Sequence, residues 1–127
     1  MKKIVLVSGG FDPIHSGHIS YLLESKKLGN ELWVALNSDE WLTRKKGKPF
    51  MNFENRARVL ENLHMVDRVF GYNDDDDSAC AAIFQALSLT SAQIIFANGG
   101  DRCVHNTPEF SVYKDHSAVE FVFGVGG

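Results

Sequence analysis

The chain alternates short apolar segments with segments of helical periodicity, and this order constrains its fold more than any other feature. The first apolar segment runs from Ile4 to Val7 and ends at two glycines. Such a run is typical of a strand that is buried on both faces. Four more strands are predicted at 32–36, 66–72, 94–97 and 119–123. Because strands that alternate with helices form a parallel sheet with right-handed crossovers, we expect one doubly wound α/β domain over residues 1–127.

Helical segments fill the intervals between these strands. We expect helices at 16–28, from 37–40 onward, at 53–64 and through 81–87. The basic stretch "TRKKGK" at 43–48 is expected to be a loop. The acidic run Asp74 to Asp77 is expected to form a turn at the start of the fourth helix, where negative charge stabilises the helix dipole.

Composition excludes several classes of partner. The chain has 127 residues and a net charge of −3, so nothing indicates bulk attraction to nucleic acid or to an anionic membrane surface. No apolar run approaches the length of a transmembrane helix. Cys80 and Cys103 have neither the spacing of a zinc cluster nor that of a disulfide framework, which favours two reduced thiols and a cytoplasmic protein.

The stretch "SGGFDPIHSGH", from Ser8 to His18, lies where the first strand gives way to the first helix. In open α/β sheets, ligands bind beyond the carboxyl ends of the strands, and a helix N-terminus attracts phosphate. Neither the G-x-x-x-x-G-K-[ST] loop nor G-x-G-x-x-G follows this strand. Imidazoles at His15 and His18 can donate hydrogen bonds to phosphate, so this stretch favours a triphosphate site at the helix start.

Other interpretations of these polar residues stay open. His15 and His18 could form a weak zinc site with Asp12, or they could simply cap the helix. The "TRKKGK" stretch could be a solvated basic turn. The run Asp74 to Asp77 could bind a metal, although it lacks the spaced ligands of a calcium loop.

Longer stretches carry a family resemblance. "GGFDPIHSGH" resembles the HxGH signature of the nucleotidyltransferase superfamily, and "GHISYLLESKKLGNELWVALNSDEWL" and "RKKGKPFMNFENRARVLENLHMVDRVF" resemble its cytidylyltransferase-like members. "FANGGDR" resembles a segment of the heptose-phosphate enzymes. The resemblance implies a Rossmann-like fold and an enzyme in which a substrate phosphate attacks the α-phosphorus of a nucleoside triphosphate and pyrophosphate leaves. It also implies Mg²⁺ bound to the nucleotide, without a dedicated metal site on the protein, and a homodimer.

The resemblance also assigns roles to individual residues. The residues implied to contact the reacting phosphates are His15, His18 and Lys45. Those implied to bind the nucleotide are Gly9, Gly10, Phe11, Gly17 and Asp101. Those implied to face the acceptor are Arg56 and Asp12. His105, which follows "NGGDR", is a further candidate near the acceptor.

The sequence leaves the substrates ambiguous. Its first half slightly favours transfer from CTP to a small phosphorylated metabolite such as glycerol 3-phosphate. "GGFDP" and "NGGD" instead favour adenylyl transfer from ATP to a sugar phosphate, such as a heptose 1-phosphate. The sequence ends at "FVFGVGG", where the superfamily usually continues into a serine- and threonine-rich loop and a last helix. We therefore expect the domain to lack that segment, and a nucleotide-binding module with impaired catalysis is a third possibility.

Overall fold

A computed structural model describes residues 1–100 and 102–126. Its centre is a five-stranded sheet in the order β3-β2-β1-β4-β5, and every neighbouring pair of strands is parallel. The strands are β1 (Lys3–Gly9), β2 (Glu31–Leu36), β3 (Arg68–Gly71), β4 (Gln93–Gly99) and β5 (Val119–Val125). This arrangement confirms the predicted doubly wound, Rossmann-like α/β fold.

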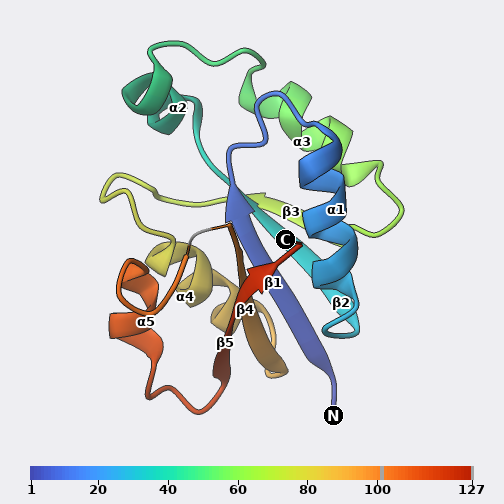
Figure 1. Cartoon of the computed structure of the whole chain (residues 1–127), viewed down its shortest axis with the longest axis vertical. Helices are drawn as coiled ribbons and strands as arrows, with labels where there is room; N and C mark the ends of the chain where they lie inside the picture. The colour runs from blue at the N-terminus through green and yellow to red at the C-terminus, as the bar shows by residue number, and fades with distance from the viewer. Residues whose placement is uncertain (101, 127) are drawn as a thin grey trace.

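Five helices surround this sheet in the part of the chain that the structure describes (Figure 1). They are α1 (Ser16–Lys26), α2 (Asp39–Lys46), α3 (Phe53–Glu61), α4 (Cys80–Leu89) and α5 (Pro108–Tyr113). One face of the sheet packs Val5 and Val7 against Leu22 of α1 and Leu60 of α3. The other face packs Ile4 and Leu6 against α4, with α5 beside it. Both faces of the sheet are therefore covered, which explains why the strands are apolar without alternation.

The structure differs from the predicted elements in two places. Residues 43–46 of the expected basic loop form the last turn of α2, which ends at Gly47 in the left-handed conformation. Basic residues stabilise the carboxyl end of a helix, so this charge pattern suits a last turn as well as it suits a loop. The structure also contains α5, a helix that is not among the predicted elements.

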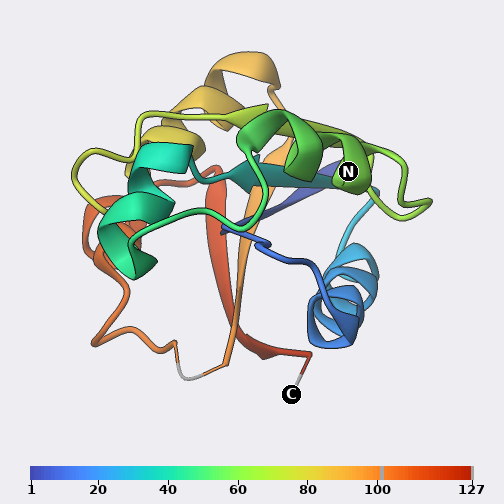
Figure 2. The same cartoon turned by 90° about the horizontal axis from the view of Figure 1, so that it is seen from above.

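The strand order places β1 at the point where the chain direction across the sheet reverses. Such a switch point leaves a crevice at the carboxyl ends of the central strands, and ligands of open α/β sheets bind there. The carboxyl end of β5 returns to the side of α1 (Figure 2), where a Cβ added to Gly126 would lie 2.9 Å from the Cα of Tyr21. The ends of β1, β4 and β5 therefore surround one space beside the start of α1.

Candidate nucleotide and acceptor site

A cavity of about 340 Å³ lies at the carboxyl ends of β1, β4 and β5. Ser8 of β1, Asn98 and Gly99 of β4, and Val125 of β5 line it, and Gly17 and Tyr21 of α1 form another wall. The Tyr21 hydroxyl donates to the carbonyl of Ala97 at 2.6 Å, and burial raises the pKa of this phenol far above its ordinary value. Tyr21 is therefore a fixed wall residue of this cavity, which is called the larger cavity below.

The histidine pair, His15 and His18, flanks Gly17, which lines this cavity. His15 is the N-cap of α1, and its Nδ1 accepts from the backbone N–H of Gly17 at 3.1 Å. The Nδ1 of His18 accepts from the backbone N–H of His15 at 3.2 Å. The two rings stack with their centroids 3.8 Å apart. The pair therefore forms a reciprocal capping box made from two imidazoles.

This cap fixes the tautomer of each ring. A nitrogen that accepts an N–H bond carries no proton, so each neutral imidazole carries its proton on Nε2. Burial and the neighbouring His15 lower the pKa of His18 below its ordinary value, which favours the neutral ring. Structural capping and phosphate binding are therefore compatible, because capping uses Nδ1 and leaves the two Nε2–H groups as donors.

Gly17 has a steric reason for its place between the histidines. A Cβ at this position would lie 2.9 Å from Cε1 and 3.1 Å from Nδ1 of the His15 ring. The sequence suggests instead that glycine admits phosphate to the backbone. The structure shows that glycine is first needed so that the His15 ring can fold back over the helix start.

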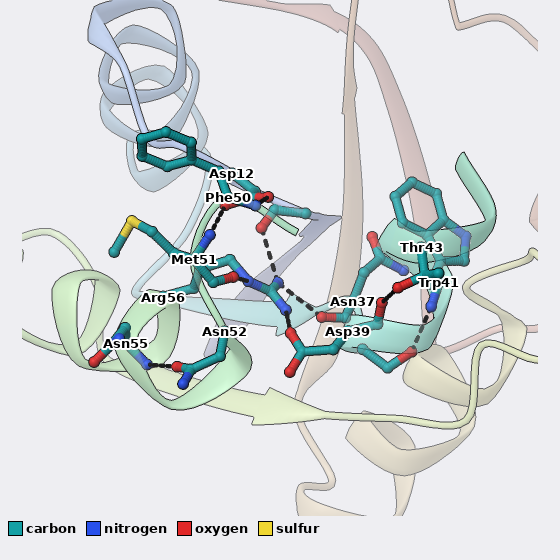
Figure 3. Close-up of polar contacts among 12 residues, drawn as sticks. Asp12, Asn37, Asp39, Trp41, Thr43, Phe50, Met51, Asn52, Asn55 and Arg56 are labelled. Carbon is teal, nitrogen blue, oxygen red and sulfur yellow. Dashed lines mark hydrogen bonds and ion pairs between the residues drawn. The ribbon is translucent and has the colours of Figure 1, made fainter. Parts of the chain in front are cut away.

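The polar clamp consists of Asp12 and Arg56, the two residues that the sequence assigns to the acceptor (Figure 3). The Asp12 carboxylate accepts from the backbone N–H groups of Phe50 and Met51, each at 2.6 Å, and pairs with Lys46 at 2.6 Å. Its side chain is 1% exposed. Burial raises the pKa of Asp12, but the hydrogen bonds from Lys46, Phe50 and Met51 outweigh this and leave the pKa below its ordinary value.

Arg56 is the other half of the clamp, and its guanidinium is fully buried. It donates to the carbonyl oxygens of Met51, Gly10 and Asn37 at 2.8–3.0 Å and to the carboxylate of Asp39 at 2.6 Å (Figure 3). These bonds join the ends of β1 and β2 to the starts of α2 and α3. The structure therefore shows Arg56 joining these segments, and its assignment to the acceptor stays a prediction.

The predicted phosphate ligand Lys45 lies in the last turn of α2. Its ammonium is 5.5 Å from the centroid of the Trp41 ring and 3.8 Å from the Asp77 carboxylate. Lys46, whose role the sequence left uncertain, contacts the carbonyl and the carboxylate of Asp12. No interaction in the described chain joins Lys45 to the histidine pair.

The acidic run contacts the starts of two helices, not only of α4 as the sequence suggests. Asp74 is 2% exposed and accepts from the backbone N–H and the hydroxyl of Ser38, the N-cap of α2, each at 2.8 Å. Asp76 accepts from the backbone N–H and the hydroxyl of Ser78, and this hydroxyl accepts from the backbone N–H of Cys80, the first residue of α4. The start of α4 is also held from α5, because Glu109 accepts from the backbone N–H of Ala79 at 2.6 Å.

A smaller cavity of about 100 Å³ lies on the other side of β1. Ser8 and Arg102 line both cavities, so the two spaces adjoin at the end of β1. Polar side chains from four separate segments line the smaller cavity: Asn37, Trp41, Tyr72, Asp77, Ser78 and Glu109. This arrangement can hold two ligands whose reacting groups meet near Ser8 and Arg102.

Of the remaining residues predicted to bind the nucleotide or the acceptor, some line a cavity and others do not. Gly9 lines the smaller cavity, and a Cβ on Gly10 would lie 2.9 Å from a methyl group of Leu42. Phe11 is buried in the core, with its ring 5.0 Å from that of His18. His105 is exposed. Asp101 lies outside the described residues.

Sequence reasoning missed most of the cavity walls. Arg102 follows the "NGGD" motif directly, and Thr107-Pro108-Glu109 is a helix-start pattern that could have indicated α5. By contrast, nothing local shows that Tyr21, Tyr72 or Glu109 faces a cavity. Their positions depend on the sheet order, which brings segments distant in sequence to one edge.

Two further findings concern metals and membranes. No cluster of three or more histidine, cysteine, aspartate or glutamate side chains placed to hold a metal occurs within residues 1–100 and 102–126. The zinc and acidic-run metal hypotheses therefore find no ligand cluster there. In the same ranges, every helix is too short or too polar to cross a bilayer.

Comparisons with known proteins agree with this geometry. The model of a family described as cytidylyltransferase-like matches residues 6–113. The chain is 42% identical over 107 residues to the bifunctional protein HldE of Blochmanniella floridana, covering 83% of this chain and 21% of that protein. It is 37% identical over 118 residues to the bifunctional protein HldE of Haemophilus influenzae strain Rd, covering 83% of this chain and 25% of that protein. The chain thus spans about a quarter of the length of these relatives.

A solved structure extends the likeness to nearly the whole chain. The lipopolysaccharide core biosynthesis protein from Thermoplasma volcanium superposes with a TM-score of 0.75 at 26% sequence identity. The match covers 97% of this chain and 96% of that one.

Proposed function

This chain belongs to the cytidylyltransferase-like family of HxGH nucleotidyltransferases, and we propose that it transfers a nucleoside monophosphate from a nucleoside triphosphate to a small phosphorylated acceptor. The observation that carries the proposal is the histidine pair: the helix cap uses both Nδ1 atoms and leaves both Nε2–H groups as donors, and Gly17, between the two histidines, lines the larger cavity. A helix cap alone would not need imidazoles, because asparagine and glutamine serve the same positions.

The choice of substrates follows the relatives. The sequence slightly favours CTP and glycerol 3-phosphate, whereas the matched bifunctional HldE proteins, at 42% and 37% identity, support the alternative. We therefore propose adenylyl transfer from ATP to a sugar phosphate of the heptose 1-phosphate kind. Transfer from CTP to glycerol 3-phosphate is the competing hypothesis.

The reaction divides between the two cavities. In our proposal the nucleotide occupies the larger cavity and the acceptor occupies the smaller one, and their phosphates meet near Ser8 and Arg102. An oxygen of the acceptor phosphate forms a new bond to the α-phosphorus. The bond from that phosphorus to the bridging oxygen breaks, and its electron pair leaves with pyrophosphate. The protein's contribution is to hold both phosphates in line and to stabilise the charge on their oxygens.

Each residue of this site has a proposed part. The Nε2–H groups of His15 and His18 donate to the triphosphate, and the guanidinium of Arg102 lies where the two phosphates meet. Lys45, at the end of α2, exchanges its distant partner Asp77 for a phosphate oxygen. Mg²⁺ enters as part of the nucleotide substrate, since the described residues offer no ligand cluster for it.

The family also supports two proposals about the protein's setting. We propose a cytoplasmic enzyme, in agreement with two cysteines that are free in the structure. We also propose a homodimer. Sedimentation of the purified chain tests the second proposal, because a monomer at working concentration would contradict it.

Pyrophosphate release tests the proposed reaction. The purified chain is assayed with ATP or CTP and magnesium, and with heptose 1-phosphate or glycerol 3-phosphate as acceptor. We expect release that requires both a nucleotide and an acceptor, with ATP and heptose 1-phosphate as the best pair. Release only with CTP and glycerol 3-phosphate would support the competing substrates. Nucleotide binding without release under any pairing would contradict the enzymatic function and favour a binding module.

A further inference from the structure

The smaller cavity contains a buried carboxylate that the proposed transfer chemistry does not use. Glu109 is 3% exposed, yet it lines this cavity. Its Oε2 accepts the N–H of Ala79 at 2.6 Å, whereas the one contact of Oε1 within residues 1–100 and 102–126 is a distant one, with a nitrogen of Arg102 at 4.0 Å. One oxygen of Glu109 therefore caps α4, and the other faces the cavity as an acceptor of hydrogen bonds.

A donor lies in the wall of the same cavity. The Tyr72 hydroxyl accepts from Nδ2 of Asn37 at 2.9 Å, and this leaves its own proton for a ligand in the cavity. Burial and the nearby Asp74 raise the pKa of Tyr72 well above its ordinary value, so the hydroxyl keeps its proton. The cavity thus offers one strong acceptor and one neutral donor.

Charge and size limit what fits there. The walls carry the carboxylates of Asp77 and Glu109. Asp77 pairs with Arg44 at 3.1 Å, whereas Oε1 of Glu109 lies 4.0 Å from a nitrogen of Arg102. A second phosphate beside Glu109 would therefore meet a carboxylate that has no close cation among the described residues. Its volume of about 100 Å³ suits a portion of a larger molecule. A neutral, hydroxyl-bearing portion of an acceptor meets these limits.

We infer that Glu109 and Tyr72 determine acceptor specificity by binding a vicinal pair of hydroxyl groups on a phosphorylated polyol or sugar, with Glu109 accepting from one hydroxyl and Tyr72 donating to the other. This inference rests on the proposed function, because it assigns the smaller cavity to the acceptor. It distinguishes this chain from nucleotidyltransferases whose acceptors lack vicinal hydroxyls. A buried carboxylate left without its hydroxyl partner disfavours a deoxy acceptor, which supplies the selectivity.

The test crosses protein variants with acceptor variants. Pyrophosphate release is measured for wild type and Glu109→Gln with glycerol 3-phosphate against n-propyl phosphate, and with a hexose 1-phosphate against its 2-deoxy counterpart. Glutamine retains an oxygen for the Ala79 N–H and presents an NH₂ group to the cavity. We expect wild type to prefer the hydroxylated acceptor in kcat/KM by roughly ten- to a hundredfold, as for a lost hydrogen bond to a charged group. We expect Glu109→Gln to lose most of this preference while the KM for the nucleotide is unchanged.

Each outcome separates the inference from the proposed function. If Glu109 only caps α4, Glu109→Gln keeps that cap, so activity toward both acceptors will stay close to wild type and the preference will persist, which overturns the inference and leaves the transfer reaction intact. If wild type releases no pyrophosphate with any acceptor, the proposed function fails and the inference fails with it. Glu54→Gln, an exposed change on α3, is the matched control and should behave as wild type. If Glu109→Gln does not fold, Tyr72→Phe tests the same cavity and should also reduce the preference.

Discussion

The polar clamp and the histidine pair both involve the segment between β1 and α1, yet they use their polar atoms differently. Asp12 and Arg56 are buried, and their charged groups are satisfied by backbone groups and by other charged side chains. In His15 and His18, Nδ1 accepts a hydrogen bond from a backbone N–H, and Nε2–H stays available as a donor. The comparison teaches that charge in a motif does not by itself indicate chemistry. Free donors beside a cavity are the better indicator, and the histidine pair has them.

The largest expected effect on stability is that of removing the clamp's guanidinium. Arg56→Leu would leave three backbone carbonyls and Asp39 without their donor. We expect the free energy of unfolding to fall by at least about 3 kcal/mol, because each of the three carbonyls left without a donor costs about 1–3 kcal/mol. Urea denaturation measures it, and Arg58→Leu, an exposed change on the same helix, is the control. Unchanged stability with a raised KM for the acceptor would place Arg56 at the acceptor. This result would contradict the difference drawn between the polar clamp and the histidine pair.

A smaller effect is expected from Asp12→Asn. The amide can accept from one backbone N–H but loses the charge that Lys46 pairs with, and we expect a loss of about 1.5–3 kcal/mol at pH 7. Because the pKa of the folded carboxyl lies below its ordinary value of 3.8, Asp12 stabilises the fold above that pH. The difference between wild type and Asp12→Asn should therefore hold from pH 7 to about 5 and shrink as the pH falls below 3.8. A difference that does not change down to pH 3 would contradict the assigned charge.

The smallest expected effect is the pH dependence contributed by His18. Its pKa in the folded chain lies below the ordinary 6.5, because burial and His15 disfavour the charged ring. The unfolded chain therefore binds the proton more readily, so stability should decline as the pH falls below 6.5. Comparing wild type with His18→Gln in denaturation curves from pH 8 to 5 isolates this slope. A wild type that gains stability toward pH 5 relative to the variant would reverse the sign and contradict the neutral tautomer.

Much of the scaffold could be predicted from sequence because its signals are local. The unbroken apolar run at Ile4 to Val7 indicates a central strand, and the change to helical spacing after Ser16 indicates α1. The alternation of such segments is enough to predict parallel strands and the edge where ligands bind. For the same reason the histidine pair could be located before the structure was known, since it lies at the first junction of strand and helix.

The rest of the site could not be predicted, because it depends on contacts between distant segments. The sequence of the basic end of α2 indicates a loop as readily as a helix. The ion pairs of Lys46 with Asp12 and of Arg44 with Asp77, which hold this end in place, join segments that are distant in sequence. The motif residue Asp12 gives no local sign that Phe50 and Met51 enclose its carboxylate. Likewise, Glu109 is one acidic residue among sixteen acidic residues, and only the fold places it at the start of α4.

The central claim is that the histidine pair caps α1 with Nδ1 and acts on phosphate with Nε2. The double variant His15→Asn/His18→Gln tests it most directly, because asparagine at the N-cap and glutamine three residues later preserve a capping box without imidazole. We predict that the free energy of unfolding stays within about 1 kcal/mol of wild type, as for one favourable cap exchanged for another. We predict that pyrophosphate release falls by roughly two to three decades, the cost of losing oriented donors to the transition state. Turnover near that of wild type in a variant of equal stability would contradict the claim and reduce the pair to a helix cap.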